Sequence, residues 1–559
     1  MSKSTARQSK IRAKAAVRTG VAPRGSPVER QVTPEATGII ARCLTTADSW
    51  LEPYFEWLVG LTLIGGFYLR MTRAAQLYLN GDEAMIMLAP LQHGIVGVCK
   101  AMLAHPHGPI PNFVLHYMTL FGSSEPFLRL PSVLAGTLLP YLVYLWIAEV
   151  HDKRAGFVAA ALLSFSPAMV ILSAQLRFYM LQMLFMAAAL YALDRAFRQN
   201  SEDWMRIFGY SAALAFLSEY MSIWFTAAAG LYALIVFASN ESSRKLLRIW
   251  IYVQIGLGAL LTASYVLHLR RLRGTPGETF ARDFWLRESY YHPELQGIPD
   301  FLLRATRNLF GYVFANPTIG IAMLFAFALG IGVLVMKEKD GTRQWATCLL
   351  LPIPITAVAA IVGQYPYGGS RHDAFLAVFI YTAVALAFSW AARRSILVLL
   401  LAGGYLIPTW WNYARHHYLD DFAQVSKREQ MQDALAYLSS RQPRPGVLVV
   451  DQLGSATIGF YICRGSVQDW ASLGPSLTTY SCGGYRVIVI DSWGAPRQAF
   501  HDAVTQARTA APKLYSDPAW MFLVQCHEVR TCAEPFVRTT DEKSVTDKVF
   551  GKIEVVRLA

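Results

Sequence analysis

The segment that decides the topology of this chain is a short apolar run, PIPNFVLHYMTLF, at residues 109–121. Its composition resembles that of a membrane span, but it has only 13 residues and contains Pro109 and Pro111. A helix needs about 20 apolar residues to cross the hydrocarbon core of a bilayer. We therefore predict that this segment is a helix lying in the membrane interface and that it is not a span.

The composition of the whole chain is that of a membrane protein. Hydrophobic residues make up 54% of its 559 residues and charged residues only 16%, whereas ordinary soluble domains carry roughly 25% charged residues. The predicted fold is a polytopic α-helical membrane protein with about 11 spans. The spans are expected near residues 54–72, 128–148, 153–171, 179–196, 204–218, 220–238, 247–269, 314–336, 343–362, 372–390 and 393–410.

The basic clusters of the short loops all fall on one side when 109–121 is not a span. They lie at residues 151–154, 195–206, 244–248, 337–343 and 393–394, on the same side as the basic N-terminus. This distribution is the positive-inside pattern, so we predict that this side is cytoplasmic. The long loops 73–127 and 270–313 then lie on the outer side.

The charge distribution divides the chain into three parts. Residues 1–49 hold nine Lys and Arg against three Asp and Glu, and we predict a disordered basic cytoplasmic tail. No aromatic residues are interleaved with these charges, which argues against nucleic-acid binding. Residues 50–415 form the transmembrane domain. In residues 420–559, a helical pattern at 430–438 and apolar runs at 447–451 and 486–491 predict an α/β domain. The odd number of predicted spans makes this domain extracytoplasmic.

Four of the seven cysteines lie in this C-terminal part. An even number of cysteines in an extracytoplasmic domain favours disulfides, most simply Cys463–Cys482 and Cys526–Cys532. The alternative is a metal site, but no zinc-type Cys-x-x-Cys spacing occurs among these cysteines.

The first candidate site is the acidic stretch Asn80-Gly81-Asp82-Glu83, just after the first predicted span. In a loop, one of two adjacent carboxylates can take a proton from a hydroxyl group while the other holds the loop or a cation. Asp82 and Glu83 are therefore the candidate catalytic residues. The alternative is structural, with Asp82 as the N-cap of a helix and Glu83 in its first turn.

The second candidate site contains the two basic residues of the short outer loops. A cation on the outer side opposes the topological preference, and a guanidinium fork fits phosphate oxygens. Neighbouring tyrosines supply donors and apolar walls for a lipid headgroup. The alternative for each arginine is that it extends to the interface. The predicted substrate-binding residues are Arg177, Tyr179, Tyr367, Arg371 and His372.

Two histidines in the first outer loop, His105 and His107, are candidate metal ligands. The alternative is that the run His105 to Pro109 forms a rigid turn. No other cofactor is predicted. The aromatic and charged loop 270–313 could bind an acceptor or a sugar, or could lie on the membrane surface.

Several motifs together resemble a known protein family. They are the acidic pair, the His-Pro turn, residues 121–132, residues 154–161 with Ser166-Pro167, residues 175–179 and residues 368–372. Together they resemble the bacterial branch of the dolichyl-phosphate-mannose protein mannosyltransferases and their aminoarabinose-transferase relatives, in the GT-C superfamily. The resemblance extends over roughly residues 50–410.

This resemblance implies an inverting glycosyltransferase, a hexosyl- or pentosyltransferase that uses a polyprenyl-phosphate sugar. The acceptor would be a protein, lipid A, a polysaccharide or a lipid on the outer face of a bacterial inner membrane. The resemblance implies that Asp82 activates the acceptor and that Arg177 and Arg371 hold the lipid phosphate. One departure concerns Leu176, because the family often has Glu at this place. If that Glu assists catalysis, either Glu219 or Asp373 replaces it or the role is absent.

The competing interpretation is a polytopic lipid or sugar transporter or flippase with an outer domain. Transporters tend to contain paired inverted repeats and broken helices, and the sequence has no such symmetry. A non-catalytic membrane anchor is a second alternative. The expected partners are a polyprenyl-phosphate-linked sugar, an acceptor of unknown identity and membrane lipid, without nucleic acid.

Overall fold

The computed structural model describes residues 52–558 with gaps. The gaps are residues 104–106, 275–277, 280–281, 284–285, 337–341, 394–395, 417–427, 441–446, 464–478, 483–484, 491–519, 525–543 and 551–552. The predicted basic tail at residues 1–49 lies outside the described residues.

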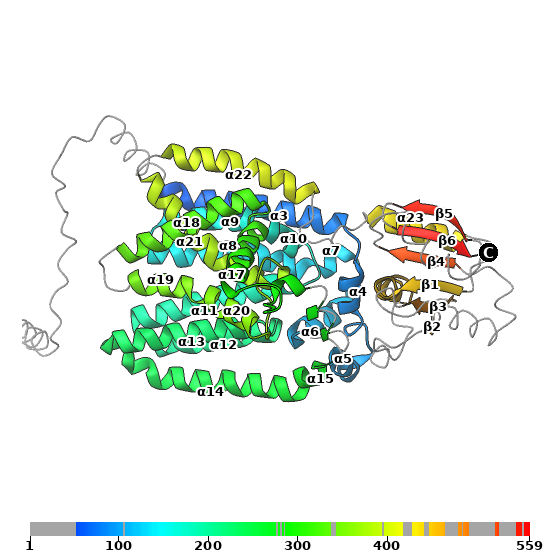
Figure 1. Cartoon of the computed structure of the whole chain (residues 1–559), viewed down its shortest axis with the longest axis horizontal. Helices are drawn as coiled ribbons and strands as arrows, with labels where there is room; N and C mark the ends of the chain where they lie inside the picture. The colour runs from blue at the N-terminus through cyan, green and yellow to red at the C-terminus, as the bar shows by residue number, and fades with distance from the viewer. Residues whose placement is uncertain are drawn as a thin grey trace, which may run out of the picture. The chain divides into compact units, whose positions relative to one another are not determined.

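A bundle of long helices makes up the first part of the described chain (Figure 1). Each of the eleven expected spans coincides with a helix or with two consecutive helices. The helices are α3 (Phe55–Gln76), α8 (Leu130–Val150), α9 (Lys153–Phe165), α10 (Pro167–Ser173), α11 (Tyr179–Gln199), α12 (Glu202–Ser218), α13 (Ser222–Ser239), α14 (Leu247–Ser264), α18 (Pro317–Met336), α19 (Thr342–Leu350), α20 (Pro352–Ile361), α21 (Ala377–Ala392) and α22 (Ile396–His416).

Not all of these helices qualify as spans by length and composition. Within the described residues, seven helical segments are long and apolar enough to cross a membrane, or eight if the bent pair α9–α10 counts as one span. Helix α3 carries Arg70 and Arg73, and α12 has 17 residues and begins with Glu202 and Asp203. The apolar helices support an integral membrane protein, but the predicted count of about 11 spans is not confirmed.

The bend between α9 and α10 is stabilised by Arg70 of α3. The two helices meet at an angle of 57°, because Pro167 has no N–H to donate to the carbonyl of Leu163, four residues earlier. The buried Arg70 guanidinium donates to the carbonyl oxygens of Leu163 at 3.0 Å and Ser164 at 2.8 Å, and to the Ser173 hydroxyl at 3.0 Å. Arg70 therefore replaces donors that the bend removes from α9.

Short helices follow α3 at one end of the bundle. They are α4 (Gly81–Met87), α5 (Gly94–Met102), α6 (Pro109–Thr119) and α7 (Glu125–Leu128). Helix α6 is the segment that we expect to lie in the interface. Its 11 residues correspond to about 16 Å, which is too short to cross a bilayer.

Other helical elements precede or connect these helices. They are η1 (Glu52–Tyr54), η2 (Glu241–Leu246), η3 (Tyr265–Leu269), α15 (Arg270–Leu272), η5 (Arg287–Ser289), α17 (Ile298–Val313) and η6 (Arg371–Leu376).

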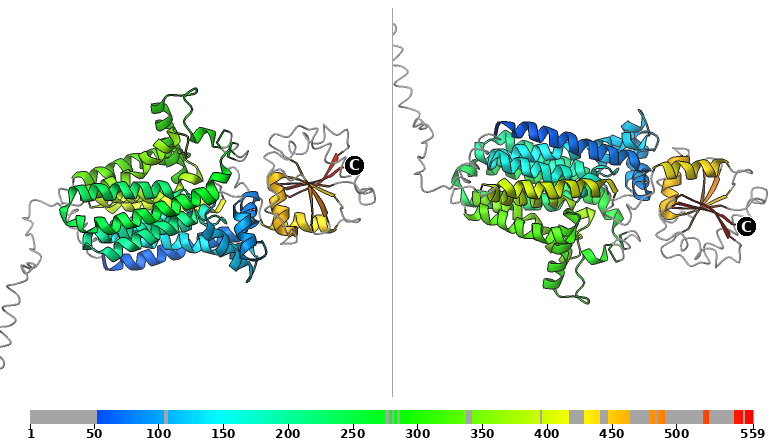
Figure 2. Two further views of the ribbon diagram at one scale, coloured as in Figure 1. Left: turned by 90° about the horizontal axis from the view of Figure 1, so that it is seen from below. Right: turned by 90° about the horizontal axis from the view of Figure 1, so that it is seen from above.

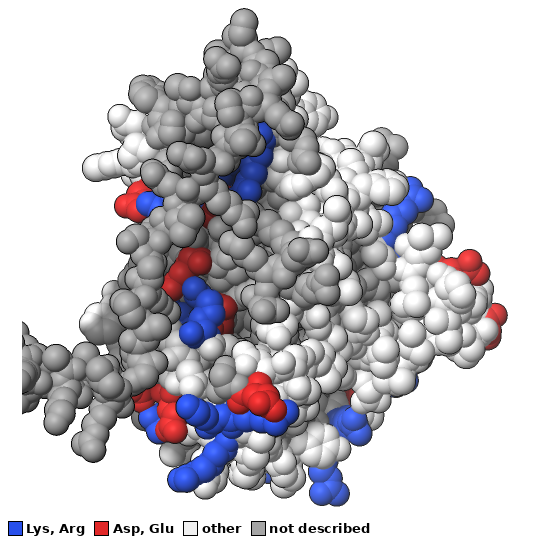
Figure 3. Space-filling model, turned by 90° about the vertical axis from the view of Figure 1, so that its left-hand side faces the viewer, with Lys and Arg blue, Asp and Glu red and all other residues white. Residues whose placement is uncertain are grey.

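The opposite end of the bundle holds loops that we predict to be cytoplasmic. Figure 3 shows Lys and Arg side chains beside Asp and Glu side chains on this face. Ion pairs form at the helix ends beside these loops, including Arg195 with Glu149 at 3.0 Å and Arg393 with Asp152 at 2.6 Å. The basic residues on this face are thus partly neutralised by acidic residues of neighbouring helices.

The C-terminal part contains a six-stranded sheet in the order β2-β3-β1-β4-β6-β5. Strand β1 is parallel to β3 and β4, and the other pairs are antiparallel. Helices of this part lie beside the sheet (Figure 2). The elements are α23 (Arg428–Ser440), β1 (Val447–Asp451), α24 (Gln452–Ile458), η8 (Gly459–Cys463), β2 (Thr479–Cys482), β3 (Tyr485–Ile490), β4 (Trp520–Val524), β5 (Ser544–Phe550) and β6 (Ile553–Leu558).

The helix predicted at 430–438 corresponds to α23, and the two predicted strands correspond to β1 and β3. Apolar residues of α23, such as Met431 and Leu438, pack with Leu448 and Val487 of the strands. Cys463 is disulfide-bonded. The side chains of the other three cysteines lie outside the described part, so the predicted pairing stays a prediction.

Candidate active site

Helix α4 carries both acidic residues of the first candidate site. Its N-cap is Asn80, whose side-chain oxygen accepts from the Glu83 N–H at 2.9 Å, while Glu83 accepts from the Asn80 N–H at 3.2 Å. This reciprocal pattern is a capping box. The structural alternative with Asp82 as the N-cap is therefore wrong by two residues, because Asn80 satisfies the first turn.

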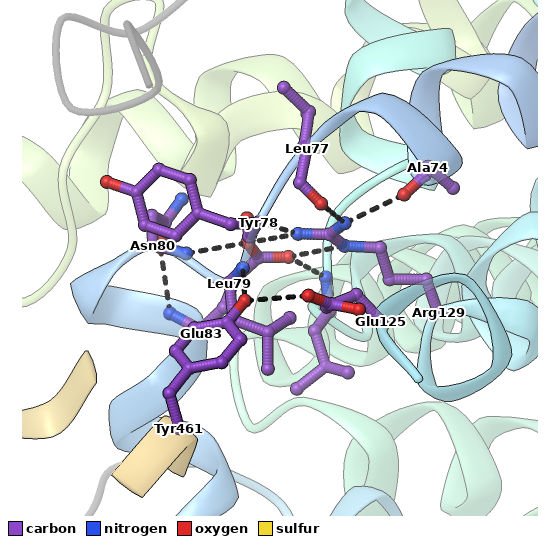
Figure 4. A network of polar contacts seen from close by, with 10 residues as sticks. Ala74, Leu77, Tyr78, Leu79, Asn80, Glu83, Glu125, Arg129 and Tyr461 are labelled. Atoms are coloured by element: carbon purple, nitrogen blue, oxygen red, sulfur yellow. Dashed lines mark hydrogen bonds and ion pairs between the residues drawn. The ribbon is translucent and has the colours of Figure 1, made fainter. Parts of the chain in front are cut away.

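Glu83 forms a buried ion pair with Arg129 (Figure 4). The Arg129 Nε and Nη2 atoms donate to the two carboxylate oxygens at 3.0 and 2.7 Å. The same guanidinium donates to the carbonyl oxygens of Ala74, Leu77 and Tyr78, at the end of α3 and just after it. Arg129 thereby fixes the segment that leads into α4, and all of its five N–H groups have acceptors.

Glu83 also contacts the loop that carries the first predicted phosphate-binding arginine. Its Oε1 atom accepts a short hydrogen bond from the Leu176 N–H at 2.5 Å. The next carbonyl along, that of Arg177, accepts from the Ser132 hydroxyl at 2.6 Å. A single buried carboxylate thus ties α4 to the loop between α10 and α11.

Asp82 lies between two arginines. The Nη2 atoms of Arg177 and Arg371 lie 2.7 and 2.8 Å from the same Asp82 oxygen, Oδ2. Both arginine side chains are less than a tenth exposed, whereas the Asp82 side chain is 24% exposed. The structure therefore brings together three residues that the sequence predicted on one side of the membrane.

These two arginines determine the ionisation of Asp82. Burial alone raises the pKa of this carboxyl, but the nearby guanidinium groups of Arg177 and Arg371 outweigh that effect and hold the pKa of Asp82 well below its usual range. Asp82 is therefore ionised at neutral pH, and while both arginines contact it, it is a weak proton acceptor.

The loop before η6 positions Arg371. Gly368 and Gly369 have φ angles of +137° and +89°, which favour glycine. A Cβ atom on Gly369 would lie 2.4 Å from the carbonyl oxygen of Asn308 in α17. The N–H groups of both glycines donate to the buried Asp373 carboxylate. Asp373 therefore holds the loop and does not face Asp82 through a direct contact.

The aromatic residues predicted near the arginines lie in different surroundings. The rings of Tyr179 and His372 meet edge to face, with centroids 6.4 Å apart. The Tyr179 hydroxyl is buried and has no hydrogen-bond partner among the described residues. Tyr367 instead bonds with the Thr306 hydroxyl of α17 at 2.8 Å. Tyr179 is therefore the better placed of the two tyrosines to meet a ligand.

The two predicted metal ligands cannot both be placed. His105 lies outside the described residues, and His107 Nδ1 lies 3.2 Å from Oε1 of Glu219. Gly108 makes this contact possible, because a Cβ atom there would lie 2.1 Å from the carbonyl oxygen of Leu217. No three His, Cys, Asp or Glu residues of the described part lie together as a metal site would need, so a metal at His105 and His107 stays a prediction.

Two further residues of the site, Glu125 and Arg129, were only weakly indicated by the sequence. Glu125 and Arg129 belong to the motif at residues 121–132, and their spacing of four is typical of one helical turn. No sequence pattern pairs Arg129 with Glu83, which is 46 residues away.

Residues 105–268 match the sequence model of a protein family described as dolichyl-phosphate-mannose-protein mannosyltransferase. The predicted resemblance to this family is confirmed over these residues. It connects this part of the chain with glycosyltransferases. The matching region includes Arg129, Arg177 and Glu219 but neither Asp82 nor Arg371, so the match itself assigns no role to the last two.

Solved structures with low sequence identity are similar to this chain. One is the oligosaccharyltransferase AglB of Archaeoglobus fulgidus in complex with an inhibitory peptide and a dolichol-phosphate, with a TM-score of 0.48, 14% identity, and coverage of 87% of this chain and 71% of that chain. Another is ArnT of Cupriavidus metallidurans bound to undecaprenyl phosphate, with a TM-score of 0.46, 13% identity and coverage of 90% and 98%. No curated protein matches the chain. These similarities are too low to transfer a substrate, an acceptor or a metal.

Proposed function

We propose that this protein is an inverting glycosyltransferase that moves a sugar from a polyprenyl-phosphate donor to an acceptor hydroxyl. The proposal rests above all on the two buried guanidinium groups, of Arg177 and Arg371, that meet at one oxygen of Asp82. The acceptor would be a protein, lipid A, a polysaccharide or a lipid. The site and the C-terminal domain would lie on the outer face of a bacterial inner membrane.

The chemistry of the reaction needs the groups that meet at Asp82. The bond between the sugar C1 atom and the phosphate oxygen breaks, and its electron pair leaves with the phosphate. The acceptor oxygen attacks C1 from the opposite face, and its proton passes to Asp82. Negative charge grows on the phosphate in the transition state, so the forked donors of Arg177 and Arg371 lower the barrier. The buried Tyr179 hydroxyl is a further donor for the same ligand.

Donor binding would also make Asp82 a better base. In the structure, both guanidinium groups neutralise its carboxylate. A phosphate that binds Arg177 and Arg371 competes with Asp82 for them, and each contact that it takes raises the proton affinity of the carboxylate. The base is therefore strongest when the donor is bound, and the acceptor loses its proton only then.

We assign Glu83 a different role from that of Asp82. Its two oxygens accept from the N–H groups of Asn80 and Leu176 and from two nitrogens of Arg129. Both oxygens of Glu83 are thus occupied by protein donors and are not available to a substrate. Glu83 thus holds α4 in place so that Asp82 faces the arginines.

A lipid or sugar transporter is the second candidate function. Such a protein could use Arg177 and Arg371 to bind a lipid phosphate, but it needs no proton acceptor between them. The two functions therefore differ in their requirement for the Asp82 charge.

The deciding experiment is turnover of radiolabelled polyprenyl-phosphate sugars by the full-length protein in lipid, with membrane extract as acceptor. We expect transfer from one donor of the panel, and loss of transfer in Asp82→Asn and Arg177→Ala. The matched controls are Asp203→Asn and Arg206→Ala, because these residues form an Asp–Arg ion pair on α12 with exposed side chains, 83% and 45%. Both controls should keep the wild-type rate.

Two results would contradict the proposal. A folded Asp82→Asn protein with the full rate of transfer would refute the role of Asp82. No transfer from any donor by a folded wild-type protein would favour the transporter. The same assay tests the metal prediction, because a rate that does not change with EDTA would remove the proposed histidine ligands.

A further inference from the structure

The C-terminal part of the chain makes direct polar contacts with the segment that carries Asp82. Tyr461, in η8, lies 382 residues from Leu79 in sequence, but its hydroxyl accepts from the Leu79 N–H at 2.9 Å. The same hydroxyl donates to Oε1 of Glu125 at 2.9 Å (Figure 4). Leu79 directly precedes the N-cap Asn80, so this bond fixes the chain three residues before Asp82.

A second residue of the C-terminal part, Arg428, also contacts Glu125. Its other oxygen, Oε2, lies 3.2 Å from Nη2 of Arg428, at the start of α23. The Glu125 side chain is only 6% exposed, and its carbonyl oxygen accepts from the Arg129 N–H at 3.1 Å. The C-terminal part therefore holds the first turn of the helix that precedes Arg129, which in turn holds Glu83.

Apolar contacts surround these hydrogen bonds. Leu79 and Met87 pack in one buried cluster with Ala456 and Phe460 of the C-terminal part. Tyr78 belongs to the cluster that contains Met431 of α23. These apolar residues shield the segment that leads into α4, while the Tyr461 side chain itself is partly buried.

The ionisation of Tyr461 agrees with its two hydrogen bonds. Burial raises the pKa of this phenol, and the Glu125 carboxylate raises it further. The hydroxyl therefore keeps its proton at neutral pH and can donate to Glu125 while it accepts from Leu79.

We propose that Tyr461 is a positioning residue through which the C-terminal domain holds α4, and with it Asp82, in the geometry needed for transfer. The proposal rests on the proposed function, because it assigns Asp82 the role of proton acceptor. Among the described contacts, Tyr461 touches neither Arg177 nor Arg371, so its effect on donor binding passes through Asp82.

The test is Tyr461→Phe in the full-length protein in lipid, which removes the hydroxyl and keeps the ring. The control is Tyr210→Phe, the same change at a tyrosine of α12 that is 68% exposed. Because displacement of a reacting group by about 1 Å can cost up to about a hundredfold in rate, we expect kcat to fall by about tenfold. The donor KM should not rise, because a displaced Asp82 competes less for Arg177 and Arg371. A merely structural role would lower the amount of active protein and leave both constants of the active enzyme unchanged.

Hydrogen exchange without substrate separates this proposal from the proposed function. Peptides that cover residues 77–88 should exchange faster in Tyr461→Phe than in the wild type or in Tyr210→Phe, because Leu79 loses its acceptor. Unchanged exchange in these peptides would overturn the proposal even if the wild type transferred no sugar. Faster exchange with an unchanged kcat would show that Tyr461 holds α4 but that the position of α4 does not limit transfer. This result would also overturn the proposal.

Discussion

Replacing Asp82 by asparagine should make the protein bind a polyprenyl phosphate more tightly while it stops transferring sugar. The change keeps the size of the side chain and removes its charge. In the wild type, Arg177 and Arg371 lie 2.7 and 2.8 Å from the Asp82 oxygen. In the wild type, a phosphate must compete with a charged carboxylate for the two arginines. In Asp82→Asn it competes only with a neutral amide.

The size of the effect follows from these two contacts. A hydrogen bond to a charged group contributes about 1.5–3 kcal/mol. The exposure of Asp82 and the bonds that an asparagine oxygen still accepts reduce the sum for both contacts to about 2 kcal/mol. At about 1.4 kcal/mol for each factor of ten, the variant should bind the lipid about 30-fold more tightly. Loss of the proton acceptor should slow transfer by about 100-fold or more.

The assay is equilibrium binding of a polyprenyl phosphate without sugar to the wild type, Asp82→Asn and Asp203→Asn in lipid nanodiscs. The exposed Asp203 is the control for the removal of one negative charge. Equal or weaker binding by Asp82→Asn would refute the competition, and with it the argument that donor binding releases the base.

Three other outcomes follow from the same contacts. Arg129→Met should destabilise the protein by about 3–5 kcal/mol, because it leaves the Glu83 carboxylate buried without its cation; thermal unfolding measures the loss, and the double variant with Glu83→Gln should recover part of it. Gly369→Ala should lower the melting temperature by the equivalent of about 1–3 kcal/mol, since φ is +89° and the new Cβ atom would meet Asn308; an unchanged melting temperature would contradict this. Burial raises the pKa of Asp82, but Arg177 and Arg371 lower it by more, so the folded-state pKa lies below the unfolded value of about 4. The Asp82 charge therefore contributes stability above about pH 4, and this contribution is lost as the pH falls from there toward the folded-state pKa. The difference in melting temperature between wild type and Asp82→Asn should therefore stay constant from about pH 5 to 8 and shrink in more acidic buffer.

Hydropathy predicted the helices well because a long apolar run has few other structures in a membrane. It predicted the number of spans less well. Helix α3 carries Arg70 and Arg73, and a sequence does not reveal whether such charges find acceptors inside the bundle. The position of a span therefore follows from local composition, but its length and its charge tolerance depend on neighbours that are far away in the chain.

The candidate site, too, was only partly predictable from the sequence. The sequence predicted that Asp82, Arg177 and Arg371 lie on one side, because this depends only on counting the spans between them. It could not predict which of Asp82 and Glu83 faces the arginines. Adjacent residues of a helix point in directions about 100° apart, and the inward direction is set by Arg129, whose partner is 46 residues away.

The contact through Tyr461 was outside the reach of sequence reasoning for a related reason. Its partner Leu79 is 382 residues away, and neither residue belongs to a recognisable motif. The sequence predicted a separate outer domain, but hydrophobic periodicity does not indicate on which surface a domain lies.

The bend between α9 and α10 has a consequence for how the protein is made. Its carbonyl oxygens depend on Arg70, which precedes Ser164 by 94 residues. During synthesis α3 therefore emerges with a guanidinium that has one acceptor in its own helix, the Gly66 carbonyl, and lacks the other three. Burying a charged group without its acceptors is costly. We expect the nascent α3 to stay near water or the insertion machinery until residues 153–173 have been made. We then expect α3, α9 and α10 to pack together in one step, because the Arg70 guanidinium joins all three helices.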